Sequence, residues 1–125
     1  MYKIIFDHFP KRTSPSGAHT QSWFFAVIRD AETKRKLREI VEEEEKINYE
    51  KRMSKEWLED LKKINTSWEK EYFSTAPYII VSFKLTYSLS PENKKLTNYY
   101  YEQSNGIANG FLLAAIHNAG LVRHC

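Results

Sequence analysis

Cysteine is almost absent from this chain, which carries a single one at Cys125. One thiol cannot form an internal disulfide, and it cannot supply a cluster of cysteine ligands for a metal. The four histidines stand at positions 8, 19, 117 and 124, and no two of them have the spacing of an HExxH zinc site. We therefore expect neither a disulfide framework nor a bound metal.

A surface charge of one sign is also missing. The 19 Lys and Arg residues are interleaved with 16 Asp and Glu residues, which leaves a formal net charge of +3. Binding to a nucleic acid depends on a basic stripe that neutralises phosphates, whereas this chain has an acidic run over residues 42–45. We therefore expect no nucleic-acid partner.

Long hydrophobic runs are absent as well. No apolar run reaches the roughly 18 residues that a membrane-spanning helix needs. The short apolar stretch near the start is interrupted by Asp7 and His8, so it is a poor signal peptide. These absences predict a cytoplasmic protein.

The composition that remains is that of a folded domain. A chain of 125 residues with 42% hydrophobic and 28% charged residues is ordinary for one globular domain, here spanning residues 1–125. Aromatic residues make up 14% of the chain, and such large side chains need a core, a ligand or an interface to cover them.

The first half of the sequence predicts a strand and a helix. The apolar run over residues 23–28 is typical of a buried strand. Asp30 is a good N-cap for a helix that begins at Ala31. Its apolar face becomes thin over residues 42–53, and we expect that part of the helix to be the most mobile.

The middle of the sequence predicts a second helix and a second strand. Ser54 can cap a helix that runs to the Ala76-Pro77 pair. Residues 78–85 form the second strand, and residues 86–96 a polar connection. The helix has an apolar stripe at helical spacing, made of Trp57, Leu61, Ile64, Trp68 and Tyr72.

A long helix over residues 97–119 follows, with Gly120 as its C-cap. Its second half is apolar nearly all round, so we expect burial on more than one side. Gly106, Gly110 and Ala114 lie four residues apart on one face, where another helix can approach closely. The crossing partner is either another part of this chain or a second subunit, and the sequence favours neither.

The sequence predicts only two complete strands. A sheet of two strands is marginal in water, and residues 121–122 look like the start of a third. A long buried helix beside so small a sheet suggests part of a larger design.

Three features could carry chemistry. The loop from Ser14 to His19 is small and glycine-containing, so it can expose backbone N–H groups to an anion, or it is a simple connector. Glu45 and Tyr49 share one helix face, where they can hold a cationic amine or form an ordinary solvated surface.

Lys70 is the third feature. It is predicted on the second helix, off the apolar stripe, where it is either a surface lysine or a partner for an anion. A carboxylate, a hydroxyl and an ammonium together would suit the zwitterionic end of an amino acid. Their spacing alone does not unite them.

Several longer motifs carry a resemblance to a known family. They are PSGAHT at 15–20, IVEEEEKINYEKRM at 40–53, DLKK at 60–63, W-x-K-E-Y at 68–72, TAP at 75–77 and LLAAIHNAGLV at 112–122. Over residues 14–122 the chain resembles the iodotyrosine deiodinase family of the nitroreductase superfamily. The resemblance implies an α+β fold with helices flanking a central sheet, built as an intertwined homodimer with FMN at the interface.

The resemblance also implies roles for individual residues. Glu45, Tyr49 and Lys70 match the residues that hold the zwitterion of the substrate. The backbone N–H of Ala18 matches the donor to the substrate phenolate. The remaining matches belong to the loop that contacts FMN, namely Pro15, Ser16 and Gly17.

The implied reaction is the reductive deiodination of mono- and diiodotyrosine, with NADPH as the ultimate reductant. Residues 42–53 would be a substrate lid. Two alternatives remain: a non-catalytic truncated isoform that pairs with a full-length subunit, and a nitroreductase-type flavoenzyme that acts on another phenol or quinone.

The chain departs from the family pattern at both ends. Residues 1–13 do not match the family's arginine-rich segment of the RRS-x-R type, and the family pattern continues beyond NAGLV. We therefore expect a partial nitroreductase-like domain with a divergent segment 1–13. We also expect the 125-residue chain by itself to bind FMN poorly.

Overall fold

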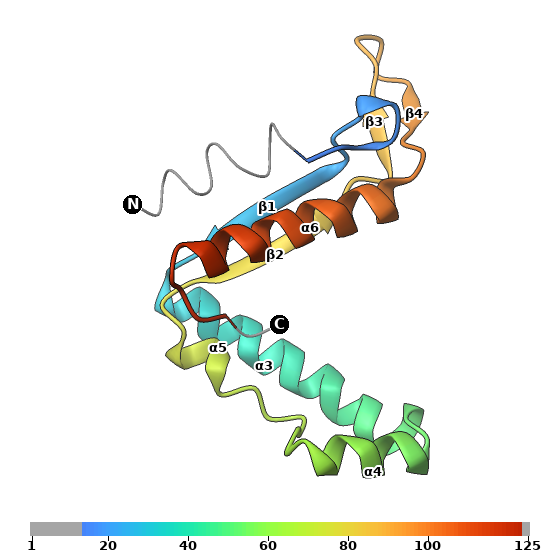
Figure 1. Cartoon of the computed structure of the whole chain (residues 1–125). Coiled ribbons are helices and arrows are strands. Elements are labelled where there is room, and N and C mark those ends of the chain that lie inside the picture. Colours follow the sequence, from blue (N-terminus) through green and yellow to red (C-terminus); the bar gives the residue numbers. More distant parts are fainter. Residues whose placement is uncertain (1–13, 124–125) are drawn as a thin grey trace. The chain divides into compact units, whose positions relative to one another are not determined.

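The computed structural model describes residues 14–123, and the predicted divergent segment 1–13 lies outside the described residues. The chain divides into two compact units (Figure 1). Residues 27–80 form one unit, called the lid unit below, and the rest of the chain forms the other, called the loop unit. Each unit is described by itself.

The lid unit begins with helix α3, Ala31–Ile47. The Asp30 carboxylate accepts a hydrogen bond of 2.7 Å from the Thr33 N–H, which satisfies one of the free donors at the helix start. The predicted cap and start are confirmed. The helix continues into a π-helical turn, η2, over Asn48–Arg52. Such turns are rare in proteins, and those that occur often lie at functional sites.

Helix α4, Lys55–Lys63, is shorter than the sequence predicts. Its N-cap is confirmed, because Ser54 Oγ accepts from the Trp57 N–H at 3.2 Å. Its C-terminus is closed by Asn65, which has φ of 53°. The last bonds are those of a Schellman motif, from Asn65 N–H to Lys62 O and from Thr66 N–H to Leu61 O, both 3.1 Å.

The prediction of one helix from Ser54 to Ala76-Pro77 is therefore wrong. An irregular connector over residues 64–71 follows α4, and only a short helix α5, Tyr72–Thr75, comes before the strand. An asparagine adopts the left-handed conformation more readily than most residues, and Thr66 and Ser67 favour turns over helix interiors. Lys70 consequently lies in the connector and not on a helix.

Strands β1, Trp23–Ile28, and β2, Ile79–Lys84, pair with each other, which confirms both predicted strands. The predicted polar connection over 86–96 is wrong, because it contains most of a hairpin. Strands β3, Tyr87–Leu89, and β4, Lys95–Thr97, are antiparallel, with Ser88 opposite Leu96. Asn93, with φ of 60°, allows the tight turn between them.

Helix α6, Tyr101–Asn118, belongs to the loop unit. It begins later than residue 97, because β4 extends to Thr97 and Tyr100 is left-handed with φ of 57°. Gly120, with φ of 70°, closes the helix as predicted. Residues 121–123 have no regular structure, so the predicted start of a third strand is wrong.

One stripe of α6 is buried, and the small-residue face is not. The buried stripe consists of Ser104, Ala108, Leu112 and Ile116. Gly106, Gly110 and Ala114 are exposed, and no atom lies within 4 Å of a Cβ built on either glycine. The prediction of burial on more than one side is wrong for this chain among the described residues, and so is the alternative of a tight intramolecular crossing.

Side-chain hydrogen bonds join α6 to β2 and to the loop before β1. Ser82 Oγ on β2 donates to Asn105 Oδ1 at 3.0 Å, and the Gly17 N–H donates to Ser104 Oγ at 3.1 Å. The combination of helices and paired strands confirms the α+β class. Among the described residues, no helix has both the length and the apolar character to cross a membrane.

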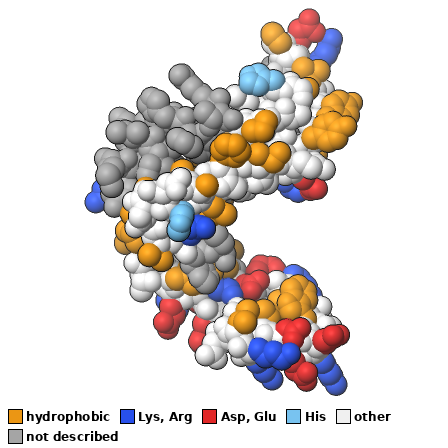
Figure 2. All heavy atoms as spheres, in the orientation of Figure 1, with side chains coloured by type: hydrophobic (Ala, Val, Ile, Leu, Met, Phe, Trp, Pro, Cys, Tyr) orange, Lys and Arg blue, Asp and Glu red, His pale blue; other side chains and the backbone are white. Residues whose placement is uncertain are grey.

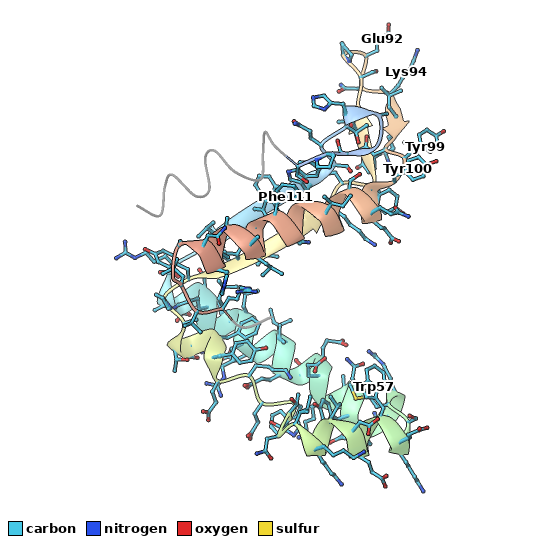
Figure 3. All side chains as sticks on the ribbon, in the orientation of Figure 1. Trp57, Glu92, Lys94, Tyr99, Tyr100 and Phe111 are labelled. Carbon is cyan, nitrogen blue, oxygen red and sulfur yellow. The ribbon has the colours of Figure 1, made fainter. Side chains whose placement is uncertain are left out.

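The surface carries both hydrophobic and charged patches. Figure 2 shows orange side chains in several clusters, and acidic and basic side chains mixed together over the part of the surface that carries α4. Tyr99 and Tyr100 precede α6 and are 69% and 68% exposed (Figure 3). At the hairpin tip, Glu92 and Lys94 form an exposed ion pair of 2.8 Å.

Candidate functional site

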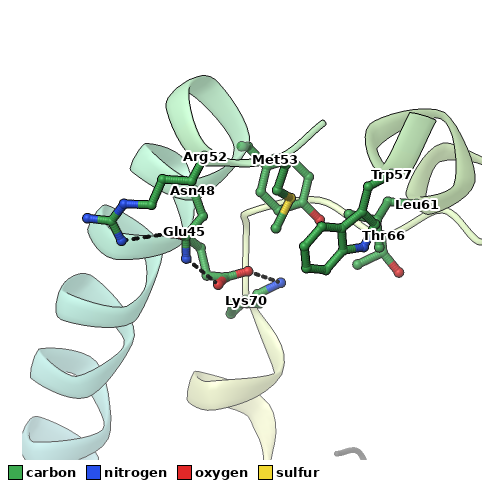
Figure 4. Close-up of a pocket in the computed structure, with 9 residues that line it drawn as sticks. Glu45, Asn48, Arg52, Met53, Trp57, Leu61, Thr66 and Lys70 are labelled. Carbon is green, nitrogen blue, oxygen red and sulfur yellow. Dashed lines mark hydrogen bonds and ion pairs between the residues drawn. The ribbon is translucent and has the colours of Figure 1, made fainter. Parts of the chain in front are cut away.

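The lid unit contains a pocket of about 400 Å³ (Figure 4). Its walls come from the end of α3, the π-helical turn, α4 and the connector that follows α4. The lining residues are Glu45, Asn48, Tyr49, Arg52, Met53, Trp57, Leu61, Thr66 and Lys70. The three residues for which the family resemblance implies zwitterion binding, Glu45, Tyr49 and Lys70, are thus brought together.

An ion pair forms the charged part of the pocket. Lys70 Nζ lies 3.4 Å from Glu45 Oε2, and the two side chains are 12% and 29% exposed. Lys70 Nζ also donates to Ser67 O at 2.7 Å, and Asn48 Nδ2 donates to Glu45 Oε1 at 3.2 Å. Both charges are therefore held in place and partly shielded from water, where electrostatic attraction is stronger than at an open surface.

The backbone of Lys70 is held by a second acidic residue. The Lys70 N–H donates to Glu42 Oε1 at 2.7 Å, and Arg38 Nε donates to the same oxygen at 2.7 Å. The bond from the Lys70 N–H, followed by the one from Arg38, lowers the pKa of Glu42 below its ordinary value. Glu42 is thus held as a carboxylate beside the pocket.

Tyr49 contributes a neutral phenol. Burial of its ring, and then the negative charge of Glu45, raise the pKa of Tyr49 above its ordinary value. At neutral pH its hydroxyl is protonated and can donate a hydrogen bond.

The remainder of the pocket wall is largely apolar. Met53 and Trp57 lie together away from the ion pair, with Leu61 beside them (Figure 4). Trp57 is 56% exposed, so a ligand that entered the pocket would cover apolar surface that water now contacts. The pocket thus joins a pair of opposite charges to a wall suited to an aromatic ring.

The predicted FMN loop lies in the loop unit and is strongly bent. Residues Gly17–His19 form a 3₁₀ turn, in which Ala18 and His19 have φ of 48° and 54°. Ser16 Oγ accepts from the Gln21 N–H at 2.9 Å. The Ala18 N–H has no hydrogen-bond acceptor within residues 14–123.

Gly17 cannot be replaced without moving its neighbours. A Cβ at this position would lie 2.9 Å from Tyr100 Cβ and 3.1 Å from the Tyr99 carbonyl oxygen. The loop is therefore clamped against the start of α6, and the bond from Gly17 N–H to Ser104 fixes it further. Pro15 and Ala18 remain exposed on the outer side of the loop.

The predicted site residues fall into two groups. Glu45, Tyr49 and Lys70 lie in the lid unit, and the residues of the loop from Pro15 to Ala18 lie in the loop unit. Each group is assembled within its own unit.

Sequence reasoning missed Arg38, Glu42 and Ser67, which hold Lys70 in place. The spacing of four between Arg38 and Glu42 is a readable signal for their ion pair. No sequence pattern signals the bond from Glu42 to the Lys70 N–H, since its partners are 28 residues apart and one of them is a backbone atom. The apolar residues of the pocket were predicted only as helix faces.

The sequence matches the family model described as "Nitroreductase family" over residues 5–121. The chain belongs to the nitroreductase family. The resemblance seen in the motifs is thereby confirmed at the family level, together with the nitroreductase fold.

Curated relatives of the chain include iodotyrosine deiodinases from three animals. The chain is 54% identical to the Danio rerio protein, 56% to the Hydra vulgaris protein and 54% to the Homo sapiens protein named iodotyrosine deiodinase 1, in each case over 110 residues. These alignments cover 88% of this chain but only 37%, 40% and 38% of the relatives. The chain thus spans about two-fifths of the length of the relatives that it matches.

A solved structure in the same family has a similar fold. It is a crystal structure of oxidized iodotyrosine deiodinase bound to FMN and 3-iodo-L-tyrosine. The TM-score is 0.71 at 27% sequence identity, and the match covers 88% of this chain and 54% of that one. Within residues 14–123, no three His, Cys, Asp or Glu residues are grouped so that they could hold a metal ion.

Proposed function

We propose that this chain functions as an FMN-dependent oxidoreductase that removes iodide from mono- and diiodotyrosine. The observation that carries the proposal is the ion pair of Glu45 and Lys70 inside a pocket with an apolar wall. The names of the curated relatives and the ligands of the similar crystal structure support it.

An amino-acid zwitterion matches the charged part of the pocket. Its ammonium can donate to the Glu45 carboxylate, and its carboxylate can accept from the Lys70 ammonium and the neutral Tyr49 hydroxyl. Glu45 and Lys70 pair with each other in the structure. A ligand with both charges can replace this one ion pair by two, one to each side chain, so that neither is left unpaired. A ligand with one charge would pair with one of the two side chains and leave the other unsatisfied, whereas an uncharged ligand would gain nothing from the ion pair.

The loop of the other unit supplies donors of the kind that a flavin ring needs. The Ser16 hydroxyl accepts from Gln21 but has no acceptor for its own proton within residues 14–123, and the Ala18 N–H is likewise available. No Lys or Arg occurs between residues 14 and 22. The loop therefore fits the polar edge of the FMN ring rather than its phosphate, and we assign Pro15, Ser16 and Gly17 to contacts with it.

The reaction replaces a carbon–iodine bond by a carbon–hydrogen bond. It consumes two electrons and one proton and releases iodide; FMN, once reduced, would supply the two electrons, with NADPH as the ultimate donor. The Ala18 N–H would donate to the phenolate oxygen of the substrate, which favours halogenated phenols because they ionise more readily. Residues 42–53 would act as a lid that excludes water once the zwitterion is bound.

A second subunit fits the open face of α6. Gly106, Gly110 and Ala114 are exposed along one face of this helix, and Phe111 beside them is 39% exposed. Small residues at this spacing let another helix approach closely, so we propose a homodimer or a pairing with a full-length subunit through this face.

The zwitterion assignment is tested with Lys70→Ala and Glu45→Ala. A charge-assisted hydrogen bond contributes roughly 1.5–3 kcal/mol, so each variant should bind 3-iodo-L-tyrosine about ten- to a hundredfold more weakly. Binding of 2-iodophenol, which has no zwitterion, and of FMN should barely change. Calorimetric titration and iodide release measure both effects.

Matched controls are Lys62→Ala and Glu43→Ala, which remove exposed charges that have no salt bridge within residues 14–123. Equal losses for iodotyrosine and iodophenol would show that Lys70 and Glu45 act through folding. Faster reduction of a nitroarene or a quinone than of diiodotyrosine would favour the alternative of another nitroreductase-type activity. A protein that takes up no FMN would favour the non-catalytic alternative.

A further inference from the structure

A row of side chains on α3 holds the segment of residues 70–76. The row has a spacing of four residues, so its members lie on one face of the helix. Its bonds run from Lys34 Nζ to Ala76 O at 2.7 Å, from Arg38 Nη1 to Ser74 Oγ at 3.3 Å, and from the Lys70 N–H to Glu42 Oε1 at 2.7 Å.

Glu42 is the member of this row that reaches the pocket residues. One of its oxygens accepts from both Arg38 Nε and the Lys70 N–H, each at 2.7 Å, and its side chain is only 18% exposed. A carboxylate with two donors on one oxygen, one of them a guanidinium, is held more firmly than a lone surface glutamate. Glu42 does not line the pocket itself.

The connector that carries Lys70 has little structure of its own. Residues 66–71 form neither helix nor strand, and Trp68 and Lys70 are only partly buried. The bond to Glu42 joins this connector to a helix 28 residues away in sequence. From that anchored backbone, Lys70 Nζ reaches Glu45 at 3.4 Å and Ser67 O at 2.7 Å.

We propose that Glu42 is the positioning residue of amino-acid recognition, because it fixes the backbone from which Lys70 projects. The proposal rests on the proposed function, in which Lys70 binds the ligand carboxylate. Glu42 touches no ligand and acts only through Lys70. Loss of the anchor lets the connector move, and displacements of about 1 Å in a binding group are enough to weaken recognition severely.

The test compares Glu42→Ala, Glu42→Gln and the control Glu43→Ala in the full chain. Glu42→Ala removes the acceptor, whereas Glu42→Gln keeps a carbonyl oxygen for the Lys70 N–H. Glu43→Ala removes an exposed neighbour with the same charge. The first measurement is hydrogen exchange at the Lys70 amide, and the second is calorimetric titration with 3-iodo-L-tyrosine and with 2-iodophenol.

We expect the Lys70 amide to exchange at least about tenfold faster in Glu42→Ala than in the wild type. Iodotyrosine should bind about tenfold more weakly to that variant, while binding of 2-iodophenol stays the same. Glu42→Gln should restore most of both properties, and Glu43→Ala should match the wild type. A general loss of folding would instead speed exchange at many amides and weaken both ligands.

The inference is overturned if the Lys70 amide is equally protected in Glu42→Ala, or if that variant keeps the full preference for iodotyrosine over iodophenol. A wild type that shows no such preference would refute the proposed function instead. The exchange data would still decide whether Glu42 anchors Lys70.

Discussion

At the scale of single residues, the pocket depends on how each charge is held. Lys70 Nζ lies 3.4 Å from Glu45 Oε2. Glu45 also accepts a hydrogen bond from the Asn48 side chain, and Lys70 Nζ also donates to the Ser67 carbonyl oxygen. Both side chains are mostly shielded, so an unpaired charge at either position would be costly. Under the proposed function, a zwitterionic ligand would satisfy both charges at once.

The carboxylate of Glu42 should make stability depend on acid. Its folded-state pKa lies below the ordinary value of 4.5, first because of the Lys70 N–H and then because of Arg38. A lowered pKa contributes stability above pH 4.5, and that stability is lost as the pH falls through the folded-state pKa. Urea unfolding should therefore show a larger fall in stability from pH 6 to about pH 3 for the wild type than for Glu42→Gln.

Glu43→Gln is the control for that measurement, since it removes a neighbouring exposed carboxylate and should keep the acid dependence of the wild type. An identical acid dependence in the wild type and in Glu42→Gln would mean that the bonds to Glu42 do not persist in solution.

At the scale of elements, the ends of helices decide where the pocket residues lie. Ser54 starts α4 and Asn65 stops it, so Trp57 and Leu61 stay on the helix while Lys70 lies on the connector. If α4 continued past residue 65, the position of Lys70 around the helix axis would be fixed by the repeat of about 3.6 residues per turn. In the structure, Lys70 pairs with Glu45 from the connector that the break creates.

Substitutions at Asn65 test this role of the break. Asn65→Ala should destabilise the protein by about 1 kcal/mol, because its φ of 53° suits alanine poorly. Asn65→Gly should be neutral or slightly stabilising, since glycine adopts this conformation without strain. Urea unfolding measures both. An alanine variant more stable than the wild type would mean that the helix prefers to continue.

Local signals in the sequence predicted the parts of the fold that local chemistry decides. The caps at Asp30, Ser54 and Gly120 and the two longer strands were correct. The stop at Asn65 was missed because the apolar stripe continues in phase through Trp68 and Tyr72. The hairpin of β3 and β4 was missed because its strands are only three residues long and exposed.

The candidate site was predictable to a different extent. Glu45 and Tyr49 could be paired from their spacing, and Lys70 joined them only through the family resemblance. The anchoring of Lys70 by Glu42 was not predictable, since it is a long-range bond to a backbone N–H. Burial of α6 was overestimated because an apolar helix face does not show whether its cover comes from the same chain.

At the scale of the whole molecule, that uncovered face of α6 predicts association. Gly110 lies in the helix interior with open space around it, so Gly110→Ala should stabilise an isolated chain by about 1 kcal/mol. The same methyl group would obstruct a closely packed second helix. Sedimentation should therefore show a weaker dimer for Gly110→Ala, although unfolding of the dilute protein occurs at higher urea. An unchanged dimer would exclude this face as the interface.

The central claim is that Glu45 and Lys70 recognise the two charges of an amino acid, and ligands that lack one charge test it most directly. Calorimetric titration would compare 3-iodo-L-tyrosine, its methyl ester and its N-acetyl derivative on the wild type, Lys70→Ala and Glu45→Ala. We predict that the wild type binds each derivative about tenfold or more weakly than iodotyrosine. Lys70→Ala should no longer distinguish the ester, and Glu45→Ala should no longer distinguish the N-acetyl compound. If both variants distinguish these ligands as well as the wild type does, Glu45 and Lys70 do not bind the zwitterion.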